Sequence, residues 1–284
     1  MPKRARDDGS QDAPPLSVPL ADLSGKAIIV TGSTSGLGKE IARSAVEASA
    51  RGVLICGRSK ERGEALVREL KAMRSDCIVD FCCADVSIAA DCEKLIQAGI
   101  KAFGTVQGLV NSAAICFPRG TLESTSLELW NSMMATNLTA PFLLIKYASE
   151  HMKEKGARGS IVNIGSICAH GGATFILAYS CTKAAMAVMT KNTASELRAH
   201  RIRVNQINMG WCLTEAEDAG QRAEKGDNWL AEADAASPVG RLLRPIDTAT
   251  SVLHYLSDAT AMVTGSIMDI SPDVIDGMLP GGTG

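Results

Sequence analysis

Residues 26–38 read Lys-Ala-Ile-Ile-Val-Thr-Gly-Ser-Thr-Ser-Gly-Leu-Gly. The first six residues predict a buried β-strand, because they form a short apolar run that a glycine-rich turn ends at once. A helical pattern follows, with Leu37, Ile41 and Ala45 on one face. Strand, glycine-rich turn and helix together predict a phosphate-binding site, since glycine lets the backbone approach a ligand and a helix N-terminus attracts negative charge. Taken alone, the turn also fits an ordinary tight connection between a strand and a helix.

The rest of the chain repeats this alternation. Further strands are predicted at residues 52–57, 77–82, 108–111, 160–164, 203–209 and 266–270, with helical segments between them. Strands that alternate with helices indicate a parallel sheet with right-handed crossovers. The sequence therefore predicts an α/β fold: one Rossmann-like, doubly wound parallel sheet with helices on both faces, over residues 22–284. A disordered tail is predicted at residues 1–21, and a substrate lid at the polar residues 214–237.

Composition narrows the class of protein. At 284 residues and 46% apolar composition the chain suits one large domain, and its 29 basic and 31 acidic residues give no sign of a nucleic-acid partner. We expect neither a membrane span nor a secretory signal, because every apolar run is short. Nine cysteines without a Cys-x-x-Cys pair and four scattered histidines predict no metal site. Reduced cysteines of this kind indicate a cytoplasmic protein.

A second informative stretch runs from Ser166 to Lys183. It follows an apolar strand and leads into an alanine-rich helix, so Tyr179 and Lys183 lie four residues apart on one helix face. A phenol has a pKa of about 10 and is a poor acid or base near neutral pH. An ammonium one turn away would lower that pKa and make Tyr179 a usable general acid or base, while Ser166 holds the reacting oxygen. The pair alone also fits a helix tyrosine beside a solvated lysine.

The order of these motifs along the chain decides between a catalytic Tyr179 and an ordinary helix tyrosine. Over residues 22–271 the chain resembles the short-chain dehydrogenase/reductase family. The family's Thr-Gly-x-x-x-Gly-x-Gly motif appears at residues 31–38, and its catalytic tetrad matches Asn137, Ser166, Tyr179 and Lys183. Three family motifs are altered: Asn-Ala-Gly is Asn-Ser-Ala at residues 111–113, Pro-Gly after the sixth strand is Met-Gly at residues 209–210, and the C-terminal Asp-Gly-Gly is Ser-Pro-Asp at residues 271–273.

The resemblance implies an NAD(P)-dependent oxidoreductase that moves a hydride between nicotinamide and a secondary alcohol or ketone. It implies that Tyr179 exchanges the proton and that Lys183 lowers the Tyr179 pKa and holds the ribose. It further implies that Ser166 orients the substrate oxygen and that Asn137 helps to hold a water. The cofactor-binding residues implied by the motifs are Gly32, Ser33, Ser35, Gly36, Leu37, Gly38, Arg58, Asp85, Val86, Asn111, Ala113, Tyr179, Lys183, Gly210 and Thr214.

The end of the second strand bears on the choice of cofactor. NAD enzymes usually carry a carboxylate there for the ribose 2′-hydroxyl. Here Gly57 is followed by Arg58, whose guanidinium could bind a 2′-phosphate. We therefore predict a preference for NADP(H), with NAD(H) as the alternative if Arg58 only stacks on the adenine. Ser35 weighs the other way, since NADP-binding members of the family often carry a basic residue there.

The substrate is predicted from the residues around the reacting groups. Ser166, His170, Tyr179 and Trp211 are expected to bind it, with Thr174 as a further hydrogen-bonding group. The acidic lid and a tryptophan suit a small polyol or sugar. A ketoreductase for an apolar or acyl carbonyl compound is the alternative, followed by a non-catalytic dinucleotide-binding protein. The expected partners are a small alcohol or carbonyl substrate and, from the resemblance, other copies of the chain in a homotetramer or dimer; no nucleic acid or membrane is expected.

Overall fold

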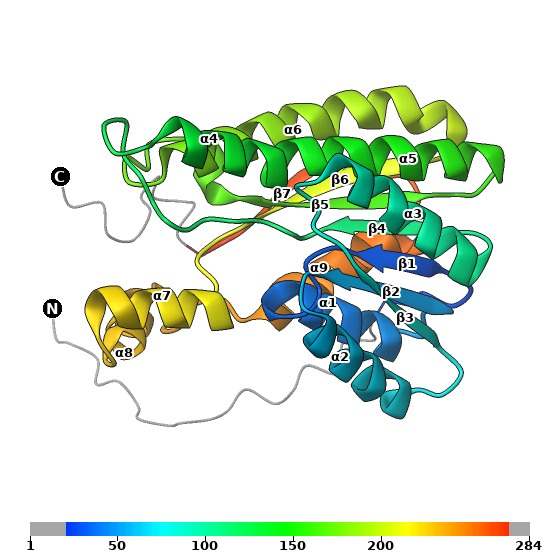
Figure 1. Cartoon of the computed structure of the whole chain (residues 1–284), viewed down its shortest axis with the longest axis horizontal. Helices are drawn as coiled ribbons and strands as arrows, with labels where there is room; N and C mark the ends of the chain where they lie inside the picture. Colours follow the sequence, from blue (N-terminus) through cyan, green and yellow to red (C-terminus); the bar gives the residue numbers. More distant parts are fainter. Residues whose placement is uncertain (1–20, 273–284) are drawn as a thin grey trace, which may run out of the picture.

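The computed structural model describes residues 21–272, and nearly all of the predicted tail, residues 1–21, lies outside them. One parallel sheet of seven strands runs through the described chain in the order β3-β2-β1-β4-β5-β6-β7 (Figure 1). The strands are β1 (Ala27–Val30), β2 (Gly52–Gly57), β3 (Ile78–Cys83), β4 (Gly108–Asn111), β5 (Ser160–Ser166), β6 (Arg203–Met209) and β7 (Ile267–Ile270). The chain runs outward from β1 to β3, returns to β4 beside β1, and continues the other way. The predicted doubly wound, Rossmann-like fold is confirmed.

Helices cover both faces of the sheet. On one face lie α1 (Gly36–Glu47), α2 (Lys60–Met73) and α9 (Pro245–Leu256), and on the other α3 (Ala89–Phe103), α5 (Ala140–Glu154) and α6 (Leu177–Leu197) (Figure 1). Successive strand residues point to opposite faces. In β1, Ile28 and Val30 therefore enter the first core, while Ala27 and Ile29 enter the second, and all four are fully buried. This double burial explains why the strands read as continuous apolar runs.

The helical segment predicted between β4 and β5 is present but interrupted. Helix α4 (Leu127–Met134) begins at Ser126, whose Oγ accepts a hydrogen bond from the Leu129 N–H at 3.2 Å. A π-helical turn (Ala135–Thr139) then joins it to α5. Such turns are often found at functional sites, and this one carries Asn137.

The polar residues 214–237 fold as two helices, α7 (Glu215–Lys225) and α8 (Trp229–Ala236), which lie beyond the sheet (Figure 1). Thr214 caps α7, because its Oγ accepts a hydrogen bond from the Glu217 N–H at 3.2 Å. Trp229 is only 1% exposed and packs with Ala233 and Leu242 in a small separate core. Although this segment is rich in acidic residues, it forms a helix pair that the buried Trp229 anchors.

Two general features of the described chain bear on function. None of the helices between residues 21 and 272 is long and apolar enough to cross a membrane. The same part of the chain contains no cluster of three or more His, Cys, Asp or Glu side chains that could hold a metal ion. All nine cysteines lie within it, and all are free thiols.

Candidate active site

A cleft of about 400 Å³ opens at the carboxyl ends of the central strands. Its floor is the turn between β1 and α1. Gly32 has a φ of +63°, and a Cβ there would lie 2.8 Å from the Ala113 Cα. A Cβ on Gly38 would collide with the Gly32 carbonyl oxygen. Both positions therefore require glycine, and the bare backbone of the turn faces the cleft.

The start of α1 fits a pyrophosphate. Ser35 occupies the N-cap position, but its side chain accepts no hydrogen bond from the helix. Within residues 21–272 no side chain accepts a hydrogen bond from the N–H groups of Gly36, Leu37 or Gly38, and these three residues line the cleft. Free N–H groups and the helix dipole favour a bound anion. The residues present consequently fit the diphosphate of a dinucleotide.

The far end of the cleft is lined by Arg58, Asp85 and Val86. The Arg58 Nη1 lies 3.8 Å from the Asp85 Oδ2, and the Arg58 side chain is 75% exposed, so the ion pair is loose. The Asp85 Oδ1 accepts hydrogen bonds from the Ser87 N–H at 3.0 Å and the Ser87 hydroxyl at 2.7 Å, which fix the carboxylate. Arg58 is therefore free to turn toward a ligand.

Most of the predicted cofactor residues line this cleft, but three do not. Ser33 is fully buried and joins β1 to β2, since its Oγ donates to the Val30 carbonyl at 2.7 Å and accepts from the Cys56 N–H at 2.9 Å. Asn111 is 2% exposed and donates to the Asn163 Oδ1 at 2.8 Å. Gly210 lines a neighbouring cavity instead. Ser33 and Asn111 do not line the cleft, because their side chains pair inside the sheet.

Tyr179 and Lys183 extend from the first turns of α6 into the cleft beside Ser166, which ends β5. Lys183 is 2% exposed, and its Nζ donates to the Ile164 carbonyl at 2.7 Å. The same Nζ lies 5.4 Å from the centroid of the Tyr179 ring. Burial lowers the Lys183 pKa to about 8. The three side chains thus come together as their spacing predicted.

The predicted lowering of the Tyr179 pKa is wrong for the protein alone. Burial, followed by the neighbouring thiols Cys116 and Cys168, raises the pKa of this phenol above its usual value, and a hydrogen bond with Ser166 only partly opposes that effect. The physical reason is that the Lys183 ammonium is itself desolvated and directs its hydrogen bond to a backbone carbonyl.

Asn137 does not line either cavity. It is fully buried, and its side chain bonds both backbone groups of Ile115: Oδ1 accepts from the N–H and Nδ2 donates to the carbonyl, each at 2.9 Å. The Nδ2 also lies 3.4 Å from the Thr182 Oγ. Asn137 therefore ties the π-helical turn to the loop after β4, which forms one wall of the site.

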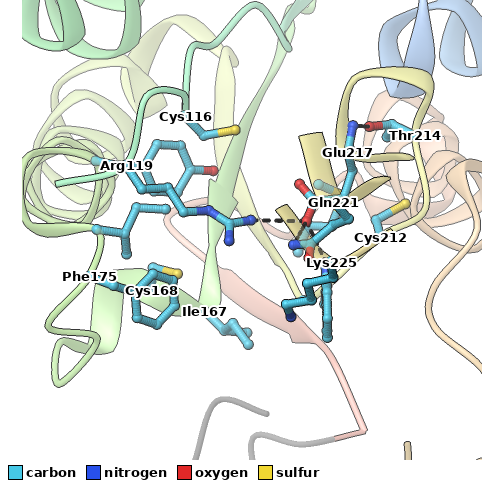
Figure 2. Close-up of a pocket in the computed structure, with 15 residues that line it drawn as sticks. Cys116, Arg119, Ile167, Cys168, Phe175, Cys212, Thr214, Glu217, Gln221 and Lys225 are labelled. Atoms are coloured by element: carbon cyan, nitrogen blue, oxygen red, sulfur yellow. Dashed lines mark hydrogen bonds and ion pairs between the residues drawn. The ribbon is translucent and has the colours of Figure 1, made fainter. Parts of the chain in front are cut away.

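Figure 2 shows a second cavity, of about 350 Å³. It shares Cys116, Tyr179, Met209 and Thr214 with the cleft. One part of its wall is apolar and includes Ile167, Phe175 and Trp211. The other part is polar and comprises Arg119, Glu217, Gln221 and Lys225. Tyr179 can thus be reached from the cleft and from this cavity, an arrangement that lets a cofactor and a substrate meet at one hydroxyl.

Comparison with known proteins agrees with this geometry. The family model described as short chain dehydrogenase matches residues 26–225. The chain belongs to the short-chain dehydrogenase family.

Individual relatives are described as dehydrogenases. The chain is 35% identical over 243 residues to 2,5-dichloro-2,5-cyclohexadiene-1,4-diol dehydrogenase LinX of Sphingobium indicum, covering 86% of this chain and 93% of that protein. It is 32% identical to the NADP-dependent (R)-specific alcohol dehydrogenase of Lentilactobacillus kefiri, covering 86% and 94%. The solved structure of a short-chain type dehydrogenase/reductase from Mycobacterium ulcerans superposes with a TM-score of 0.80 at 27% identity, covering 88% and 89%. This short-chain dehydrogenase is therefore an NAD(P)-dependent oxidoreductase that acts on CH–OH groups.

The substrate residues of this short-chain dehydrogenase were predicted only in part. Trp211 lines the cavity as expected. His170 and Thr174 do not line it. The His170 Nε2 lies 3.0 Å from the Asp269 Oδ1, and its side chain is 54% exposed. The sequence reasoning missed Arg119, Gln221 and Lys225. The spacing of Glu217 and Gln221 on one face of α7 was the only available signal, and nothing in the sequence connects Arg119 with them.

Proposed function

We propose that the protein is an NADP(H)-preferring dehydrogenase that oxidises a secondary hydroxyl of a small polyol or sugar, or reduces the matching carbonyl. One observation carries the proposal: the dinucleotide cleft and a cavity with a polar wall meet at the Tyr179 phenol. The bound dinucleotide supplies the nicotinamide ring that gives or accepts the hydride. The protein's own residues supply position, charge and a proton.

The side chains at the junction divide these tasks. The Tyr179 phenol exchanges the proton with the substrate oxygen, and the Ser166 hydroxyl orients that oxygen beside it. Lys183 has a pKa of about 8, so at neutral pH it remains mostly protonated and places a positive charge near the phenol as the proton leaves. Asn137 is proposed to act indirectly, because its side chain holds the backbone of Ile115 in place.

The cofactor preference rests on the far end of the cleft. The end of β2 carries Gly57, so no carboxylate there repels a 2′-phosphate, and Arg58 lines the cleft with its guanidinium largely in solvent. A relative that is described as NADP-dependent supports this choice. NAD(H) is the competing cofactor.

The polar wall of the substrate cavity favours a hydroxylated substrate. Four hydrogen-bonding or charged side chains line it, Arg119, Glu217, Gln221 and Lys225. A purely apolar carbonyl compound would remove water from these groups without adding a hydrogen bond to any of them, which costs affinity. The apolar part of the wall keeps a ketoreductase for such compounds as the second candidate.

Three further properties are proposed with this function. Residues 214–237 form a lid, because α7 carries part of the cavity wall. The free thiols suit the reducing conditions of the cytoplasm. A homotetramer or dimer is proposed on the family resemblance.

The substitution Tyr179→Phe tests the central assignment. The ring keeps its packing while the hydroxyl is lost, so turnover should disappear and dinucleotide binding should remain. The absorbance change at 340 nm is measured with polyols and aldoses beside apolar secondary alcohols and ketones, and cofactor binding by calorimetry. Turnover within about tenfold of the parent enzyme would remove Tyr179 from the chemistry. A higher kcat/KM for the apolar set would replace the polyol by the second candidate.

A further inference from the structure

The carboxylate of Glu217 is held by one oxygen only. Its Oε1 accepts hydrogen bonds from the Trp211 Nε1 at 2.7 Å, the Gln221 Nε2 at 2.8 Å and the Arg119 Nη2 at 3.1 Å. Figure 2 shows Arg119 reaching across the cavity toward Glu217 on α7. Three donors on one oxygen fix the plane and direction of the carboxylate.

The other oxygen of Glu217 remains available. Among residues 21–272 no side chain or backbone group donates a hydrogen bond to its Oε2, although the residue lines the cavity and its side chain is only 12% exposed. A carboxylate can accept hydrogen bonds on both oxygens. The arrangement therefore presents one oriented, negatively charged acceptor to a ligand in the cavity.

Gln221 independently indicates that a ligand supplies a hydrogen-bond donor in this cavity. It is 1% exposed and lines the same cavity, and its Oε1 is buried without a partner in the described chain. The amide orientation is set by Glu217, because its carboxylate requires the Nε2 to point toward it. A buried acceptor without a partner costs free energy unless a ligand satisfies it.

The charges around this site select a neutral donor. Arg119 and the Lys225 ammonium, which lies 5.4 Å from the centroid of the Trp211 ring, disfavour a cationic ligand. Glu217 itself disfavours an anionic one. A hydroxyl is the neutral group that donates to a carboxylate and makes no charge conflict.

We propose that Glu217 binds a second hydroxyl of the substrate, with Gln221 as an additional acceptor, and so selects diols and polyols over simple alcohols. This inference rests on the proposed oxidation of a CH–OH group at Tyr179. Tyr179 and Glu217 line the same cavity, so one substrate can contact both side chains.

The test compares cyclohexanol with the cyclohexane-1,2-, 1,3- and 1,4-diols in the parent enzyme and in Glu217→Gln, with NADP(H). The substitution keeps an oxygen for the three donors and replaces the free acceptor by an NH₂ group. We expect the parent to prefer at least one diol by about tenfold or more in kcat/KM. Glu217→Gln should lower kcat/KM for that diol by roughly ten- to hundredfold relative to cyclohexanol, so that the diol preference is lost.

Glu224→Gln is the matched control. Glu224 lies on the same helix and accepts from the same arginine, at 3.4 Å from the Arg119 Nη1, but it is 48% exposed and does not line the cavity. Its substitution should change both substrates by less than about threefold. Equal use of cyclohexanol and every diol by the parent enzyme overturns the inference, as does an unchanged diol preference in Glu217→Gln.

Calorimetric binding to the Tyr179→Phe protein with NADP⁺ separates this inference from the proposed function. Diol binding that is tighter than cyclohexanol binding and that Glu217→Gln abolishes supports the inference, even if the parent enzyme turns over no alcohol and the proposed function fails. Turnover of all alcohols without a binding preference has the opposite meaning: the proposed function stands and the role of Glu217 is refuted.

Discussion

Replacement of Arg58 by alanine should shift the enzyme from NADP(H) toward NAD(H). In the free protein the Arg58 guanidinium makes a loose ion pair, 3.8 Å from the Asp85 Oδ2, with its side chain 75% exposed. Such an exposed pair contributes about 0–1 kcal/mol. The substitution should therefore leave the free energy of unfolding nearly unchanged, and any loss of activity should come from cofactor binding.

The size of the effect follows from the same exposure. A charge-assisted hydrogen bond contributes about 1.5–3 kcal/mol when it is protected from water. Solvent around Arg58 reduces this to about 1–2 kcal/mol, which corresponds to a loss of roughly 5- to 30-fold in kcat/KM with NADP(H). kcat/KM with NAD(H), which has no 2′-phosphate, should change by less than about threefold. The NADP(H) effect should shrink as salt is added.

The assay is steady-state kinetics with each cofactor at one fixed substrate concentration, for the parent, Arg58→Ala and Lys60→Ala. Lys60 is the matched control, because it is 76% exposed and pairs with Glu64 at 3.7 Å but does not line the cleft. Its substitution should leave the cofactor preference in place. Equal or better use of NAD(H) by the parent enzyme would refute the reasoning, and so would an equal loss with both cofactors in Arg58→Ala.

Three other predictions follow from the site. Gly38→Ala should abolish dinucleotide binding in calorimetry, because its Cβ meets the Gly32 carbonyl oxygen under the cleft; binding like that of the parent would contradict this. Residues 214–237 should gain protection from hydrogen exchange when cofactor and substrate are added, and unchanged exchange would exclude a lid. Burial lowers the Lys183 pKa to about 8, so between pH 8 and 10 the unfolded chain binds the extra proton, and Lys183 makes a contribution to the free energy of unfolding that rises with pH. Buried thiols such as Cys56 and Cys116, whose pKa burial raises, make the opposite contribution. In denaturant unfolding, the free energy of unfolding of the parent minus that of Lys183→Met should therefore rise between pH 8 and 10, and a constant difference would exclude this linkage.

The sequence was sufficient for the fold because its signals are local. An apolar run between a turn and a helix indicates a buried parallel strand, and residues 26–38 carry strand, turn and helix start in one stretch. The two glycines that the cleft requires, Gly32 and Gly38, are visible there. Tyr179 and Lys183 were equally accessible, since a helix of known period places residues four apart on one face.

Only the tertiary structure decided which partners the polar side chains bond. Ser33 and Asn111 lie within the expected motifs but pair inside the sheet, while His170 turns to Asp269 on β7. The Tyr179 pKa depends on burial, which no spacing reveals.

The wall of the substrate cavity depends on tertiary structure most of all. Arg119 follows β4 and Glu217 lies on α7, 98 positions later in the chain, yet their side chains meet at 3.1 Å. Local patterns determine which elements form, because the strand and helix periods are short. The polar contacts of the site form between elements that are distant in sequence, so they are determined only when the sheet brings the carboxyl ends of its strands to one edge.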